Sequence, residues 1–195
     1  IMGILPDVAK GLHIGISQAG HFIAAYALGV VVGAPLLTSF ANKMDSRKML
    51  LLLMGWFTIS NTVSGFSDSY YTLLVARFLS GLPHGAFFGI GAVVAGKLAK
   101  EGKSAQAIAV MFSGLTLANV VGVPIGTYIG HQYNWSMSFY MVGLVGVLAV
   151  SSIFLWMPKL VSEPKEPSIN HQKVIKNGEL WALIALTTIG TGGFF

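Results

Sequence analysis

The chain has 195 residues, of which 54% are hydrophobic and only 10% are charged, and its mean hydropathy is +0.71. A soluble domain carries about 25% charged residues, so this composition excludes an ordinary water-soluble protein and indicates several membrane-spanning helices. The chain has no cysteine, which excludes disulfide bonds and thiolate metal sites.

Long apolar stretches follow one another along the whole chain. About 20 apolar residues are needed to cross the ~30 Å hydrocarbon core. Residues 1–5 resemble the end of a first span, and residues 179–195 resemble the start of a seventh. Five further spans are expected at 17–41, 49–66, 71–96, 105–129 and 137–157. We therefore expect a piece of a longer protein, truncated at both ends.

The twelve lysine and arginine residues fix the expected orientation. One side of the membrane receives ten of them: Lys43, Arg47, Lys48, Lys97, Lys100, Lys103, Lys159, Lys165, Lys173 and Lys176. The other side receives Lys10 alone, and Arg77 lies inside a span. This is the positive-inside pattern, so the basic side is cytoplasmic. It accounts for the net charge of +5 without a nucleic-acid-binding surface.

Three regions follow from this layout. We expect residues 1–157 to form an N-terminal transmembrane bundle and residues 179–195 to begin a C-terminal one. Between them, residues 158–178 are polar and contain three prolines, as expected of a cytoplasmic linker.

The sequence contains an internal repeat. "LGVVVGAPLLT" (28–38) and "LANVVGVPIGT" (117–127) agree at six of eleven positions, including Gly33 with Gly122 and Pro35 with Pro124. The first copy runs outside to inside and the second inside to outside. Two groups of three spans related by inversion are typical of one half of a secondary transporter. Proline permits bending, and glycines spaced by four residues permit close helix packing, as at Gly81, Gly85, Gly122 and Gly126.

Arg77 is the clearest candidate functional residue. It lies about six residues inside the outer end of its span, ~9 Å deep at ~1.5 Å per residue. An ionised side chain there costs ~2.5 kcal/mol or more, so it normally faces a partner or a wet cavity. The alternatives are an arginine that reaches the outer interface or that binds backbone carbonyls.

Other polar residues could line a mid-membrane cavity. His84 lies two turns after Arg77, and because the ordinary pKa of a histidine is near neutral, it could carry protons or bind substrate. It could equally be a packing residue beside Pro83. Asn119 stands where the other repeat copy has Val30, and it is either a cavity residue or an interhelical tie. The weaker candidates are Tyr26 and His21.

Three motifs resemble the major facilitator superfamily, and more narrowly its twelve-span drug–proton antiporters and arabinose-efflux-like permeases. "ARFLSGLPHGAFFGIGAVVAGKLA" (76–99) carries the family's Arg-x-x-x-Gly-x-x-x-Gly run. "SGLTLANVVGVPIGTYIG" (113–130) resembles the Gly/Pro-rich fifth helix of the antiporters. "TSFANKMDSRKMLL" (38–51) falls at the family's Gly-x-x-x-Asp-Arg-x-Gly-Arg-Arg loop, with neutral Asn42 at the aspartate position and Asp45 at the second glycine.

The resemblance implies an all-α six-helix bundle built from 3+3 inverted repeats, with Arg77 responding to proton load. It also implies that the loop gates the cytoplasmic side through Asn42, Lys43, Asp45, Arg47 and Lys48. We expect a monomeric, multi-pass transporter of the bacterial inner membrane that exports a small organic molecule, drug-like or sugar-like, in exchange for protons.

Two alternatives stay open. One is an importer of sugars or metabolites with the same fold, and the other is a membrane structural or sensor protein without transport. No nucleophile set, metal-ligand spacing or phosphate-binding loop is visible in the sequence, so we expect neither an enzyme nor a cofactor.

Overall fold

The structure is a computed structural model, and it describes residues 1–41, 44–158, 178, 181–182 and 185–186. The chain divides into two units, Ile1–Leu160 and Val161–Phe195. The predicted linker and the predicted seventh span lie almost entirely outside the described residues. The architecture below is therefore that of the first unit.

Helices joined by short turns make up the described part of this unit. A short 3₁₀ turn, Met2–Ile4, leads into α1 (Leu5–Gly11). The bundle continues with α2 (Ile16–Ala41), α3 (Ser46–Gly65), α4 (Tyr70–Leu98), α5 (Ser104–Leu117), the π-helical turn η2 (Ala118–Gly122), α6 (Val123–Gln132) and α7 (Trp135–Trp156). Because α5, η2 and α6 form one continuous helix, all five complete predicted spans are confirmed as helices.

Four of the described helices are long and apolar enough to cross a membrane. They are Ile16–Phe40, Tyr70–Leu98, Ser104–Gln132 and Trp135–Trp156. The fifth, α3, is less apolar because its C-terminal half is polar, and it packs along both α4 and α7. Many large apolar side chains remain exposed, among them Val31, Val120 and Leu155 at 70%, 67% and 70%. Such exposure suits a surface that faces lipid.

Local sequence signals explain where the helices begin. Asp45 caps α3 by accepting hydrogen bonds from the backbone N–H groups of Arg47 and Lys48. Ser69 and Thr72 form a reciprocal capping box at the start of α4. Asn134 caps α7 through the backbone N–H of Ser136. Each cap satisfies backbone donors that the first helical turn leaves unpaired.

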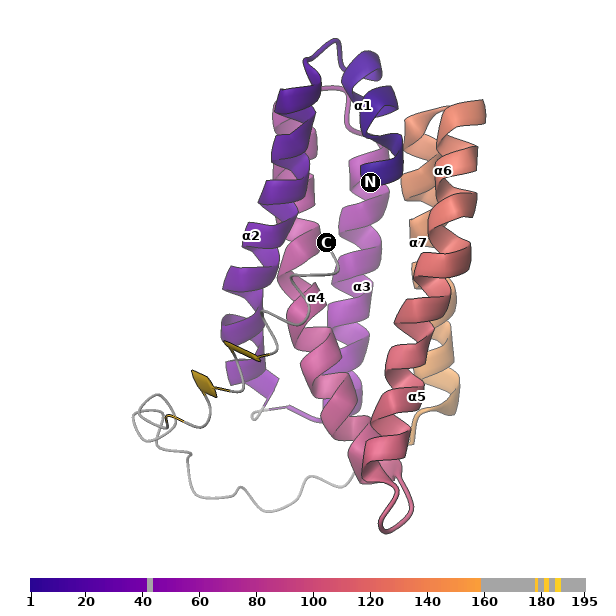
Figure 1. The fold of residues 1–195 in the computed structure, drawn as a ribbon. Coiled ribbons are helices and arrows are strands. Elements are labelled where there is room, and N and C mark those ends of the chain that lie inside the picture. The colour runs from indigo at the N-terminus through magenta and orange to yellow at the C-terminus, as the bar shows by residue number, and fades with distance from the viewer. Residues whose placement is uncertain (42–43, 159–177, 179–180, 183–184, 187–195) are drawn as a thin grey trace. The chain divides into compact units, whose positions relative to one another are not determined.

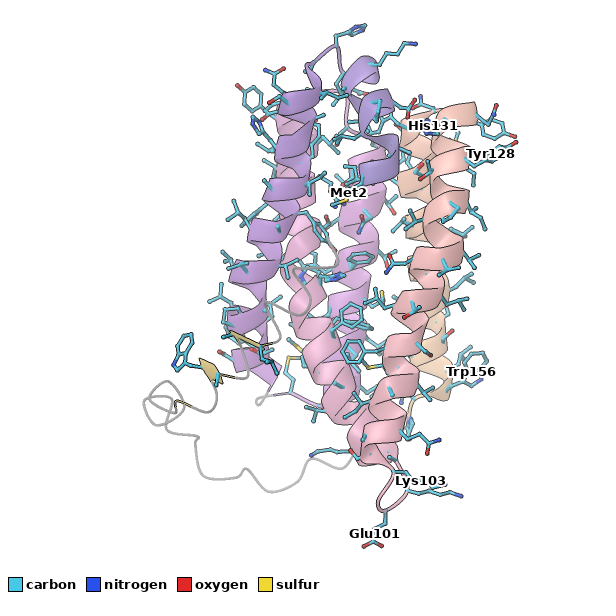
Figure 2. All side chains as sticks on the ribbon, viewed as in Figure 1. Met2, Glu101, Lys103, Tyr128, His131 and Trp156 are labelled. Atoms are coloured by element: carbon cyan, nitrogen blue, oxygen red, sulfur yellow. The ribbon has the colours of Figure 1, made fainter. Side chains whose placement is uncertain are left out.

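The two copies of the repeat run in opposite directions in the bundle (Figure 1). The segment 28–38 descends within α2, whereas 117–127 ascends through η2 into α6. Figure 2 shows Tyr128 and His131 at the end of the bundle opposite Glu101 and Lys103. The inverted arrangement predicted from the repeat is therefore confirmed.

Glycines bring α2 and α4 into their close contact. A Cβ added at Gly33 would strike the backbone of Leu82, and one added at Gly81 would strike the carbonyl of Tyr26. At Gly85 the added atom would lie 2.8 Å from the Cβ of Ala34. The close packing predicted for Gly81 and Gly85 is thus present in the structure.

The second copy of the repeat packs differently. A Cβ at Gly122 would meet no atom within 4 Å, and one at Gly126 would lie an ordinary 3.5 Å from Met141. The helix also changes form here. Pro124 follows the π turn, whereas Pro35 lies inside a regular α-helix. The two copies of the repeat therefore run in opposite directions, as expected, but they differ in local packing.

Two buried apolar clusters hold the unit together. One lies at the α1 end of the bundle and joins α1, α2, α4 and α7 through residues such as Val8, Phe22 and Trp135. The other joins α3 to α4 near the opposite end through residues such as Leu53, Ala86 and Ile90. Between these clusters lies the polar group that forms the candidate site.

Candidate functional site

Arg77 is buried inside the bundle and is contacted from three other helices. Arg77 is only 7% exposed. Its Nη1 donates a hydrogen bond of 3.3 Å to Oδ1 of Asn61 on α3. The guanidinium carbon lies 4.3 Å from the ring centroid of Tyr26 on α2 and 5.7 Å from that of Phe139 on α7. Aromatic faces attract a cation, most strongly where water is excluded.

The contacts of Arg77 leave its charge incompletely matched. No carboxylate contacts Arg77 within residues 1–41 and 44–158, and its buried Nε has no hydrogen-bond acceptor there. An unsatisfied buried donor costs about 1–3 kcal/mol, and more when the group is charged. The site therefore favours an additional acceptor or anion beside the guanidinium.

Tyr26 also contacts His84, which lies in an aromatic environment. The Tyr26 hydroxyl and Nδ1 of His84 are 2.8 Å apart. The imidazole lies 6.3 Å from the ring of Phe57 and 5.0 Å from that of Phe88, measured between centroids. Phe88 in turn stacks on Phe112 of α5 with centroids 5.8 Å apart. These contacts form a continuous chain of rings across α2, α3, α4 and α5.

Asn119 lies within the π-helical turn η2 and is exposed in this unit. It follows Phe112 by seven residues, which places it on the same side of the helix two turns closer to α6. Its side chain makes no hydrogen bond to any residue that the structure describes. A free amide at membrane depth is unfavourable facing lipid, so it suits a wet cavity or a polar partner.

His21 belongs to a separate group at the end of the bundle where α1 lies. Its Nδ1 lies 2.7 Å from the hydroxyl of Tyr70, which links α2 to α4. A second contact at this end joins α1 to α6, where Nδ1 of His131 lies 2.6 Å from Oδ2 of Asp7. The structure therefore brings together Arg77, Tyr26 and His84, while His21 joins neither this group nor the histidine–aspartate pair.

The predicted gating loop is only partly described. Asn42 and Lys43 lie outside the described residues. Asp45 uses its carboxylate as the cap of α3, and Lys48 is exposed. Arg47 reaches across to α7, where its Nη2 donates to the carbonyl of Phe154 and its guanidinium carbon lies 5.6 Å from the Phe154 ring. The loop's arginine thereby binds the last turn of α7.

No set of three or more metal-ligating side chains occurs among the residues that the structure describes. The polar group of the candidate site consists of an arginine, an asparagine, a tyrosine and a histidine. This set can bind anions, donate and accept hydrogen bonds and carry protons.

Comparison with known proteins identifies the family. The family model of the Major Facilitator Superfamily matches residues 1–195. The chain belongs to the Major Facilitator Superfamily. It is 38% identical over 195 residues to the putative transporter AraJ of Escherichia coli (strain K12), covering 100% of this chain and 50% of AraJ. It is 40% identical over 194 residues to the inner membrane transport protein YdhP of the same organism, covering 100% of this chain and 50% of YdhP.

A solved structure has the same fold. The crystal structure of the human organic anion transporter MFSD10 (TETRAN) aligns with a TM-score of 0.58 and 21% identity, covering 84% of this chain and 39% of MFSD10. The chain spans about half the length of the curated relatives it matches. It corresponds to the N-terminal half of a superfamily protein.

Sequence reasoning missed two members of the Arg77 site in this superfamily bundle. Asn61 holds Nη1 of Arg77, and Phe139 supplies a second aromatic face. Asn61 could have been found, because a carboxamide inside an apolar span normally has a polar partner. Phe139 carries no such signal, since phenylalanine is ordinary in a membrane helix.

Proposed function

We propose that this chain is the N-terminal half of a secondary transporter that exports a small organic molecule in exchange for protons. Inverted repeats in one bundle support alternating access, in which this half and a second bundle rock about a mid-membrane site. The curated relatives AraJ and YdhP are both named as transporters, which supports transport as the activity of the whole protein.

The single observation that carries the proposal is the state of Arg77. It is a buried cation held by one neutral amide and two aromatic rings, with Nε unsatisfied among the described residues. Such a cation attracts a carboxylate from another part of the whole protein. Protonation of that carboxylate would weaken the pair and free the bundle to change conformation, which couples proton movement to transport.

The remaining site residues have proposed roles that follow from their positions. His84, Tyr26 and Asn119 line the substrate cavity, and His21 lies at its outer entrance. Gly33 supplies close packing between α2 and α4, and Pro35 and Pro124 supply bending in the two inverted helices.

We further propose that the transporter lies in the bacterial inner membrane as a monomer. The linker 158–178 and the loop with Asn42, Lys43, Asp45, Arg47 and Lys48 lie on its cytoplasmic side. The described basic residues near α3, α4 and α5 support this orientation.

The test uses the complete protein in everted membrane vesicles with an imposed proton gradient. Ethidium is the drug-like probe and L-arabinose the sugar-like probe. We expect one probe to enter the vesicles as protons leave the vesicle lumen. This exchange should be abolished in Arg77→Ala and retained in Lys10→Ala. Membrane levels of both variants should equal those of the wild type. Normal coupled transport by Arg77→Ala would overturn the proposal, and movement down the probe gradient without protons would favour the importer.

A further inference from the structure

Tyr26 stands between a cation and a histidine. The guanidinium carbon of Arg77 lies 4.3 Å from the centroid of its ring, and its hydroxyl oxygen lies 2.8 Å from Nδ1 of His84. Arg77 and His84 belong to the same helix, α4, whereas Tyr26 belongs to α2. The ring is thus the physical link between the charge of Arg77 and the imidazole.

The charge of Arg77 affects the direction of the hydrogen bond. A cation over an aromatic face draws electron density from the ring and, through it, from the phenolic oxygen. The hydroxyl then donates more strongly and accepts more weakly, because polarisation passes along a connected chain of polar groups. The favoured arrangement has the Tyr26 O–H donating to Nδ1 of His84.

The proton on the other ring nitrogen follows from this. A neutral imidazole carries one ring proton, so when one nitrogen accepts a hydrogen bond the other nitrogen is protonated and is the donor. Nε2 of His84 therefore carries a proton. It makes no hydrogen bond to any residue that the structure describes, and the imidazole is only partly buried.

We infer that Arg77 and Tyr26 are positioning residues that fix His84 as an Nε2–H donor for an acceptor oxygen of the transported molecule. Phe57 and Phe88 lie beside the imidazole and Phe112 stacks on Phe88, so an aromatic body beside that oxygen would extend this row of rings. The ligand class is therefore an aromatic molecule with a carboxylate or carbonyl group. This inference rests on the proposed transport function, because it names the substrate group that His84 binds.

The tautomer is measured without any transport assay. The complete protein, labelled with ¹⁵N in its histidine rings, is placed in lipid nanodiscs at pH about 8.5, well above histidine's ordinary pKa of about 6.5. His84 is assigned by its loss in His84→Gln. We expect Nδ1 to give a pyridine-type signal and Nε2 a pyrrole-type signal. The reverse assignment in the wild type would overturn the inference, whatever the transport assays show.

The molecule contains an internal control for the effect of Arg77. His21 and Tyr70 form a similar pair, with Nδ1 2.7 Å from the hydroxyl, and no arginine contacts the Tyr70 ring among the described residues. Tyr26→Phe and Arg77→Met should each shift His84 toward a mixture of tautomers while leaving the His21 signals unchanged. An unchanged His84 spectrum in folded Arg77→Met would overturn the role of Arg77. Tyr26→Phe provides the same test for the hydroxyl if Arg77→Met does not fold.

The ligand class is tested with two matched probes. Benzoate carries acceptor oxygens, and benzylammonium has a similar aromatic body with a cationic donor group. We expect benzoate, and not benzylammonium, to move the Nε2 signal of His84, and we expect Tyr26→Phe to reduce that response. A response to benzylammonium alone, or to neither probe, would overturn the assigned ligand class. Because these are binding measurements, their failure is separable from failure of proton-coupled export.

Discussion

The guanidinium carbon of Arg77 lies 4.3 Å from the ring centroid of Tyr26, so a membrane-buried cation rests on the face of an aromatic ring from another helix. This contact joins α4 to α2 beside the glycines that bring the two helices together. It also explains how an arginine is tolerated at this depth. The aromatic face replaces part of the stabilisation that water would give, and Asn61 supplies one hydrogen bond.

The first prediction separates the Tyr26 ring from its hydroxyl. Tyr26→Phe keeps the ring under Arg77 and removes only the bond to His84, which is worth about 1 kcal/mol. Tyr26→Leu also removes the cation–π contact, worth about 2 kcal/mol where water is excluded. Tyr26→Leu should therefore lower the thermal midpoint of the purified complete protein more than Tyr26→Phe does. Equal losses would show that the ring contact with Arg77 contributes nothing.

The second prediction compares the two copies of the repeat. Gly33→Ala places a methyl group against the backbone of Leu82, and such overpacking costs about 1–3 kcal/mol. Gly122→Ala meets no atom within 4 Å and gains helix propensity. We expect a lower thermal midpoint only for Gly33→Ala. A matching loss in Gly122→Ala would show that this position packs closely in the complete protein.

The sequence predicts the helices well because a membrane span needs length and apolarity, both of which are local properties. The predicted spans 17–41 and 71–96 match α2 and α4 to within a few residues. Partner contacts are not local. That Tyr26, Asn61 and Phe139 surround Arg77 depends on how four helices pack, and no spacing along the chain records it.

The repeat also shows that local sequence does not predict packing contacts. Gly33 and Gly122 occupy matching positions in the sequence, yet only Gly33 touches a neighbouring backbone. The π turn before Pro124 was also not predictable. Proline removes one backbone hydrogen bond in both copies, but the surrounding packing determines whether the helix forms a wider π turn there.

The third prediction distinguishes two roles of Asp45. Its carboxylate caps α3 through the backbone N–H groups of Arg47 and Lys48, whereas the family resemblance implies a charged gate. Asp45→Asn keeps a good cap without the charge, and Asp45→Ala loses both, at a cost of about 0.5–2 kcal/mol in stability. We expect only Asp45→Ala to lower the thermal midpoint.

Transport by the same two variants completes that test. If the charge of Asp45 gates the cytoplasmic side, Asp45→Asn should transport poorly while remaining as stable as the wild type. Wild-type transport rates in Asp45→Asn would assign the residue to helix capping alone.

The last prediction concerns Asn61, the residue that holds Nη1 of Arg77 at 3.3 Å. Asn61→Leu removes the acceptor and leaves a further buried donor of Arg77 unsatisfied, which should cost about 1–3 kcal/mol and lower the thermal midpoint. Asn61→Asp instead places a permanent carboxylate beside the guanidinium. The two charges then pair where Arg77 is buried, so the folded Asn61→Asp protein should be more resistant to heat than Asn61→Leu.

The two Asn61 variants should also differ in how they fail. If Arg77 responds to a proton-dependent carboxylate elsewhere in the transporter, a fixed carboxylate at position 61 competes with it. Asn61→Asp should then be stable but slow in proton-coupled transport, whereas Asn61→Leu should lose transport in proportion to its lost folded protein. Thermal midpoints measure the stability of the two variants, and vesicle transport normalised to folded protein measures their transport rates. A stable Asn61→Asp that transports at the wild-type rate would contradict a coupling role for Arg77, because its counter-charge could then be permanent.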